Sequence, residues 1–193
     1  MSRLLLPVTA ALWACAHASA PRVPGPSMEV ALDVGTPSER PLTPGRAFEV
    51  LMKFDPGLPA YVPRRFRFLL AQGGHIVFTL YGTTGDGGPG SRLVEIDRLY
   101  DPAMASSGKD GRWIVEEVTL PPDRRVQRGP LWIGFHGPVG GGGGGNDPRL
   151  WACSHDSGLV FQRDPDPATP LSSTRIPRTP TLRVEVEPAP PAP

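Results

Sequence analysis

The stretch RFRFLLAQGGHIVFTL, residues 65–80, contains two apolar runs separated by Gly73-Gly74. Apolar residues stand at every second position of both runs, and arginine fills alternate positions at the start of the first. A period of two places successive side chains on opposite faces of a β-strand. A glycine pair between two such runs is typical of a hairpin turn. The stretch therefore predicts two antiparallel strands, each with one apolar face.

The same alternation recurs along the chain, between segments rich in glycine and proline. Residues 91–100 fit either a helical turn or a strand, and Trp113–Leu120 fits a strand whose alternation slips near Glu116-Glu117, as at a β-bulge. Further strands are expected within residues 28–34, 48–54, 131–135, 158–162 and 182–186. Because 23 glycines and 26 prolines disfavour helix interiors, we predict an all-β fold. We expect an antiparallel β-sandwich of about nine or ten strands, jelly-roll-like in topology.

Length and charge limit the classes of function. A chain of 193 residues suits one domain, which we place at residues 28–187, followed by a disordered Pro-rich tail at residues 188–193. The 20 basic and 19 acidic residues give a formal net charge of +1. A nucleic-acid-binding domain carries a clear excess of basic residues, so we expect no nucleic acid partner.

The N-terminus carries a targeting signal. Leu4–Ala14 is apolar and follows Arg3, and its length fits the core of a signal peptide but not a membrane-spanning helix. We therefore predict an exported protein with a signal peptide at residues 1–14 and a Pro-rich tether at residues 15–27. Ala16-His17-Ala18 and Ala18-Ser19-Ala20 both fit the small-x-small pattern of ordinary signal peptidase, so cleavage after Ala18 or Ala20, with release of the protein, is the alternative.

The end of the apolar segment bears on that choice. Leu12-Trp13-Ala14-Cys15 resembles the lipobox of bacterial lipoproteins. The resemblance implies cleavage before Cys15, lipid attachment at Cys15 and a firm membrane anchor of several acyl chains. Ala16 is not the aspartate that holds this class at the inner membrane, so the resemblance implies the outer membrane or the cell surface. Cleavage after Ala20 instead predicts a periplasmic or secreted protein.

The second half of the chain carries a further likeness. GRWIVEEVTLPP, GPLWIGFHG, GLVFQRD and TPTLRVEV, which begin at residues 111, 129, 158 and 179, resemble the second half of jelly-roll modules on secreted bacterial proteins. Those modules include carbohydrate-binding and galactose-binding-like domains. The resemblance implies a jelly-roll fold, with a glycan or an envelope protein as the partner.

Aromatic residues are the best candidates for binding. Alternation within Leu131–Phe135 places Trp132 and His136 on the outward face of that strand, and Trp151 lies on the next predicted strand beyond a glycine-rich segment. Such a platform would stack on a sugar ring or anchor a protein partner. The alternative is that these tryptophans fill the core or cover a sheet edge.

No catalytic residue is assigned. Cys153–Gly158 places Ser154, His155 and Asp156 in a row, but the members of a catalytic triad converge from separate segments, so this run predicts a turn. Gly140–Gly145 lacks the lysine of a phosphate-binding loop. The sequence therefore predicts a non-enzymatic binding or structural module of the cell envelope. A secreted carbohydrate-binding domain is the alternative, and a hydrolase is the third hypothesis.

No cofactor and no zinc site are expected, because the four histidines are scattered and no paired cysteines occur. Cys153 is expected to be a buried, unpaired thiol. A structural calcium ion stays open as an alternative, because loop oxygens suit calcium. Its candidate ligands are Asp86, Asp101, Asn146 and Asp147.

Overall fold

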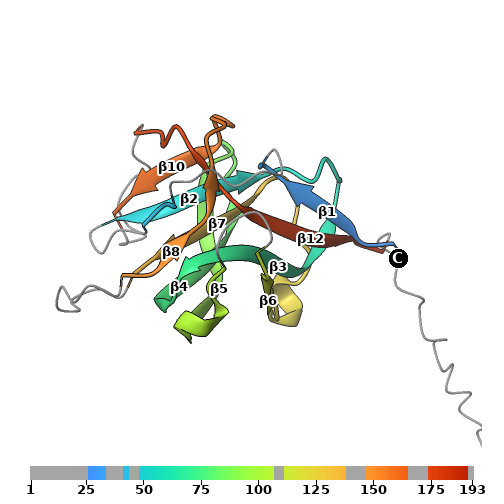
Figure 1. Ribbon diagram of the computed structural model, residues 1–193. Helices are drawn as coiled ribbons and strands as arrows, with labels where there is room; N and C mark the ends of the chain where they lie inside the picture. The colour runs from blue at the N-terminus through green and yellow to red at the C-terminus, as the bar shows by residue number, and fades with distance from the viewer. Residues whose placement is uncertain are drawn as a thin grey trace, which may run out of the picture.

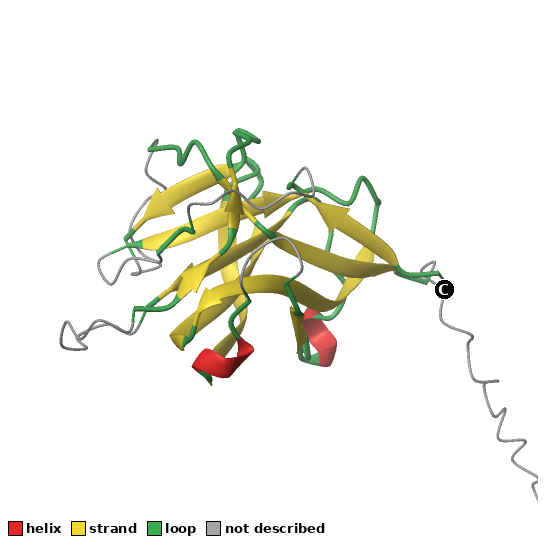
Figure 2. Ribbon diagram, in the orientation of Figure 1, coloured by secondary structure: helices red, strands yellow, loops and turns green. Residues whose placement is uncertain are grey.

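The computed structural model describes residues 26–33, 41–43, 48–106, 111–137, 147–164 and 174–190. The predicted signal peptide, Cys15, most of the predicted tether and Asn146 lie outside these ranges, as do residues 191–193 of the predicted tail. The described part of the chain contains twelve strands and two single-turn 3-10 helices (Figure 2). Neither helix is long and apolar enough to cross a membrane.

The longest strands lie in the middle of the chain: β3 (Tyr61–Gln72), β4 (Gly74–Thr83) and β5 (Pro89–Tyr100). Residues 91–100 are therefore strand and not a helical turn. The other elements are β1 (Met28–Ala31), β2 (Glu49–Phe54), η1 (Pro102–Met104), β6 (Trp113–Glu117), η2 (Pro122–Arg124), β7 (Leu131–His136), β8 (Arg149–Leu150), β9 (Ala152–Cys153), β10 (Val160–Arg163), β11 (Thr179–Pro180) and β12 (Leu182–Pro188).

Two antiparallel sheets face each other (Figure 1). One has the strand order β1-β12-β3-β6, with β8 paired to the end of β3, and the other has the order β10-β2-β7-β4-β5. Among the strands of these two sheets, only β4 and β5 follow one another within one sheet, and the chain otherwise crosses to the opposite sheet from each strand to the next. The first and last strands, β1 and β12, are neighbours, as in a jelly roll. The predicted all-β antiparallel sandwich is confirmed. The described strands outnumber the nine or ten expected because β8, β9 and β11 have only two residues each.

The apolar faces of β3 and β4 form the centre of the core. Phe66, Phe68, Phe78 and the neighbouring aliphatic side chains are fully buried. The ring centroid of Phe78 lies 4.9 Å from both Phe66 and Phe68. Each such side chain stabilises the fold by about 1.5–3 kcal/mol through removal of apolar surface from water. The predicted alternation separates core from surface around Phe66 and Phe68, whereas Leu69, Val77 and Thr79 of the opposite face are also buried.

The predicted hairpin at Gly73-Gly74 is wrong, because β3 and β4 do not pair. β3 bonds to β12, β6 and β8, whereas β4 bonds to β5 and β7. The chain passes from one sheet to the other at Gly73, where a Cβ would lie 2.5 Å from the backbone nitrogen of Pro102. Glycine is needed here because the backbone after β5 comes too close for any side chain.

Two strands end at residues that differ from the prediction. β6 stops at Glu117, and its pairing with β3 contains no register shift, so the predicted bulge near Glu116-Glu117 is absent from this pair. β12 continues to Pro188, one residue beyond the expected domain end. Met28 pairs with Val186, so the described chain enters and leaves the sandwich at the same end (Figure 1).

Candidate functional site

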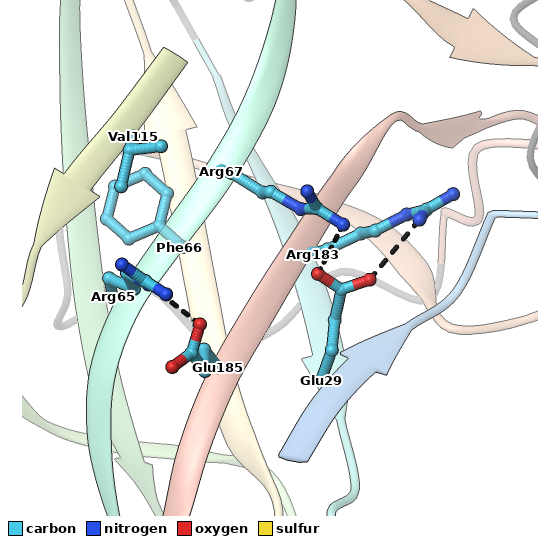
Figure 3. Close-up of a pocket in the computed structure, with 7 residues that line it drawn as sticks. All are labelled: Glu29, Arg65, Phe66, Arg67, Val115, Arg183 and Glu185. Atoms are coloured by element: carbon cyan, nitrogen blue, oxygen red, sulfur yellow. Dashed lines mark hydrogen bonds and ion pairs between the residues drawn. The ribbon is translucent and has the colours of Figure 1, made fainter. Parts of the chain in front are cut away.

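A groove lies on the outer face of the sheet β1-β12-β3-β6. It has a volume of about 190 Å³, and its lining residues come from β1, β3, β6 and β12 (Figure 3). We call it the β3–β12 groove. Its lining residues are Glu29, Arg65, Phe66, Arg67, Val115, Arg183 and Glu185.

Strand alternation places these charges on one face. In β3 and β12 the phenylalanines and valines point into the core, so the residues between them point outward. Pairing of the two strands sets Arg65 opposite Glu185 and Arg67 opposite Arg183. The second pair brings two like charges together, which would be destabilising without a counter-ion.

Glu29 of β1 supplies that counter-ion. Its Oε2 lies 2.6 Å from Nη2 of Arg67, and its Oε1 accepts a hydrogen bond of 3.2 Å from Nη1 of Arg183 (Figure 3). On the other side of the groove, Nε of Arg65 donates to Oε2 of Glu185 at 2.7 Å. The Arg65 guanidinium holds the pKa of the Glu185 carboxyl below its ordinary value. The groove therefore presents alternating donors and acceptors.

Neighbouring side chains fix the positions of Arg67 and Arg183. Arg183 donates from Nε and Nη2 to the Asp33 carboxylate at 3.1 and 2.9 Å, and the Asp33 side chain is only 1% exposed. The guanidinium carbons of Arg67 and Arg183 lie 4.6 and 4.9 Å from the ring centroid of Trp113. Cation–π contacts at this distance are favourable. These contacts hold the two guanidinium groups in place before any ligand arrives.

The aromatic residues proposed for binding do not form one platform. Trp132 points away from the main core as expected, but it is only 2% exposed and packs against Phe161 at 5.6 Å between ring centroids. His136 is partly exposed, with Nδ1 2.6 Å from the carbonyl oxygen of Gly137. Trp151 lies beside β3 in the other sheet, and its Nε1 donates to the carbonyl oxygen of Ser106 at 3.0 Å. None of these three residues lines the β3–β12 groove.

A buried charged cluster shares the outer face of the second sheet with Trp132. Nη2 of Arg163 donates to Oε2 of Glu49 at 2.7 Å, and the two side chains are 3% and 1% exposed. The hydroxyl of Tyr81 donates to Oε1 of Glu49 at 3.0 Å. Burial raises the pKa of the Glu49 carboxyl, while the hydrogen bonds from Arg163 and Tyr81 oppose that shift. Because Glu49 is closed off from solvent and bonded to Arg163 and Tyr81, it is a structural group.

Two of the candidate calcium ligands, Asp86 and Asp101, lie far apart in the described part of the chain. Asp86 lies in the β4–β5 turn, where it accepts hydrogen bonds from Thr84 and from the backbone of Gly88. Asp101 lies at the opposite end of the same hairpin and caps η1 through the backbone N–H of Ala103 at 2.7 Å. About 30 Å separates the two ends of a ten-residue strand. Among the described residues, no group of three or more metal-ligating side chains is found.

The run from Cys153 to Gly158 forms a turn, as expected. Oδ1 of Asp156 accepts a hydrogen bond of 2.8 Å from the backbone of Gly158, whose φ is +71°. The carbonyl oxygen of His155 accepts a hydrogen bond from the Thr179 hydroxyl at 2.9 Å. Cys153 is buried with a free thiol, as predicted. These polar groups therefore form hydrogen bonds within the turn and to the neighbouring Thr179.

Comparison with known proteins gives no family. No protein-family profile matches the chain, and no curated protein matches it either. Among solved structures, the chain is similar to one in the structure of infectious bursal disease virus, Gx strain, with a TM-score of 0.33 and 11% identity. The match covers 84% of this chain but only 36% of the viral chain. A TM-score this low assigns neither fold nor function.

The sequence contains a pattern that indicates the groove, although we chose aromatic residues as the binding candidates. Arg65 and Arg67 alternate with phenylalanine, and Arg183 and Glu185 alternate with valine. Each pattern predicts an outward charged stripe on its own strand. Only the pairing of β3 with β12, more than a hundred residues apart in sequence, places the stripes side by side.

Proposed function

We propose that this chain is an exported envelope protein, anchored by lipid at Cys15, whose jelly-roll domain acts as a non-enzymatic binding module. The apolar segment before Cys15 and the lipobox-like Leu12-Trp13-Ala14-Cys15 support the anchor. Residues 16–27 would then join the membrane to β1 at Met28. We place the protein at the outer membrane or cell surface.

One observation carries the binding role: the β3–β12 groove presents charged side chains that neighbouring residues hold in place. Asp33 and Trp113 fix Arg183, and Trp113 also holds Arg67. Groups that are already ordered lose little conformational freedom on binding a ligand. A purely structural envelope role remains the competing function, and it predicts no ligand for the groove.

Mass spectrometry of the mature N-terminus tests the anchor. We expect a diacylated or triacylated Cys15 in the membrane fraction and detergent-phase partitioning of the wild-type protein. The Cys15→Ala variant should move to the aqueous phase. Cys153→Ala is the matched control, because Cys153 is buried in the domain, and it should partition like wild type. An unmodified terminus at Ala16 or beyond would overturn the anchor, and a terminus at Pro21 would support release by cleavage after Ala20.

A further inference from the structure

We propose that the β3–β12 groove binds one uncharged sugar residue of a glycan. This inference rests on the proposed role as a binding module and names the class of ligand and the site. It moves the site away from Trp132, His136 and Trp151 to the outer face of the other sheet. The donors, charge balance and volume of the groove support it.

The polar groups of the groove match hydroxyls better than ions. Arginine can only donate hydrogen bonds and an ionised carboxylate can only accept them, whereas a hydroxyl does both. Arg65 pairs with Glu185 through Nε, and Arg67 pairs with Glu29 through Nη2, so each guanidinium keeps N–H donors outside the pair that is drawn in Figure 3. Two neighbouring hydroxyls of a sugar would contact a guanidinium and its carboxylate together. An anion would compete with Glu29 and Glu185 for the same arginines.

The groove and its immediate neighbours carry no excess of positive charge. The guanidinium groups of the three arginines face the carboxylates of Glu29, Glu185 and Asp33. Glu117, opposite Arg65 on β6, adds a fourth carboxylate outside the groove lining. A site without a positive excess gains little from attracting an anion. A neutral ligand therefore suits it best.

The apolar surface and the size fit one sugar ring. Val115 is 46% exposed at the side of the groove, whereas the ring of Phe66 is fully buried in the core. Val115 therefore offers an apolar contact for the C–H face of a sugar. The volume of about 190 Å³ equals roughly six water molecules at about 30 Å³ each. That space holds one monosaccharide unit.

The test is binding of the full-length protein to an array of neutral and acidic polysaccharides, in a detergent without a sugar headgroup. We expect retention on a neutral glycan with little dependence on ionic strength, because no ion pair forms with the ligand. Isothermal titration with an oligosaccharide of the retained glycan then measures affinity. Arg65→Ala and Glu185→Ala should each weaken binding by about tenfold or more. Both side chains are partly exposed and form a surface ion pair, so the variants should fold.

Arg92→Ala is the matched control, since Arg92 forms a similarly exposed ion pair with Glu95 on β5 of the other sheet. It should bind like wild type. Neutral glycan binding that is unchanged in Arg65→Ala would overturn the site while leaving the binding role standing. Retention of acidic glycans alone would overturn the ligand class. Folded wild-type protein that binds no glycan would overturn the inference, and the separate N-terminal analysis would still decide the anchor.

Discussion

The side chain of Glu49 lies across Gly134, a residue of the neighbouring strand β7. A Cβ at position 134 would overlap the Glu49 carboxylate. The missing side chain lets Glu49 extend over the sheet to Arg163 on β10 and Tyr81 on β4. One glycine therefore permits a buried charge to be neutralised on a sheet face.

We expect Gly134→Ala to lower the free energy of unfolding by about 2–4 kcal/mol, because Glu49 must leave its buried partners or strain the sheet. Urea denaturation measures the change. Gly85→Ala is the control: Gly85 lies in the β4–β5 turn, and a Cβ there would meet nothing within 4 Å. The control should stay within about 0.5 kcal/mol of wild type. Equal stability of the two variants would show that Glu49 moves freely.

Removal of Arg163 should make stability depend strongly on pH. In Arg163→Met the burial that raises the pKa of Glu49 is no longer opposed by the guanidinium. The folded state then keeps a proton that the unfolded state has lost above pH 4.5, so stability falls as pH rises through the folded pKa, by about 1.4 kcal/mol per pH unit. At neutral pH we expect a loss of about 3–5 kcal/mol.

The double variant Glu49→Gln/Arg163→Met separates charge from packing. It carries no buried charge at this site, so it should recover part of the lost stability at neutral pH. The free energy of unfolding of the double variant should also lack the strong pH dependence expected for Arg163→Met. Denaturant titrations at several pH values measure both effects. A single variant with the same pH dependence as the double variant would contradict the assignment to Glu49.

The tyrosines should report alkaline unfolding. Burial raises the pKa of all three, Tyr61, Tyr81 and Tyr100, and that of Tyr81 reaches about 12. Between pH 10 and the raised values the folded state holds protons that the unfolded state releases, so stability falls as pH rises above 10. We expect tyrosinate absorbance to appear together with loss of the circular dichroism signal. Absorbance that rises at pH 10 in folded protein would disprove this burial.

Sequence periodicity was sufficient to predict the fold class, because alternation within a single strand identifies both the strand and its apolar face. Alternation in β3 and β4 separates Phe66 and Phe78 in the core from Arg65 and Arg67 at the surface. It also places Trp132 on the correct face of β7. Exposure was harder to predict, because Trp132 is covered by Phe161, which lies about thirty residues away in the chain.

Pairing between distant strands could not be predicted from local pattern. The groove needs β1, β3 and β12 in register, and the cluster around Glu49 needs β2, β4, β7 and β10. Neither turn chemistry nor hydrophobic period specifies partners so far apart in sequence. For the same reason, the glycine pair at residues 73–74 suggested a hairpin where the chain in fact changes sheets.

That corner supplies the last prediction. Gly73→Ala should lower the free energy of unfolding by about 2 kcal/mol or more, since the new methyl group would lie 2.5–2.8 Å from backbone atoms of Asp101 and Pro102, which cannot rotate away. Thermal unfolding of Gly73→Ala beside Gly85→Ala compares the two positions directly. Equal melting temperatures would mean that the backbone after β5 does not pack against the corner, and the passage between sheets would need another explanation.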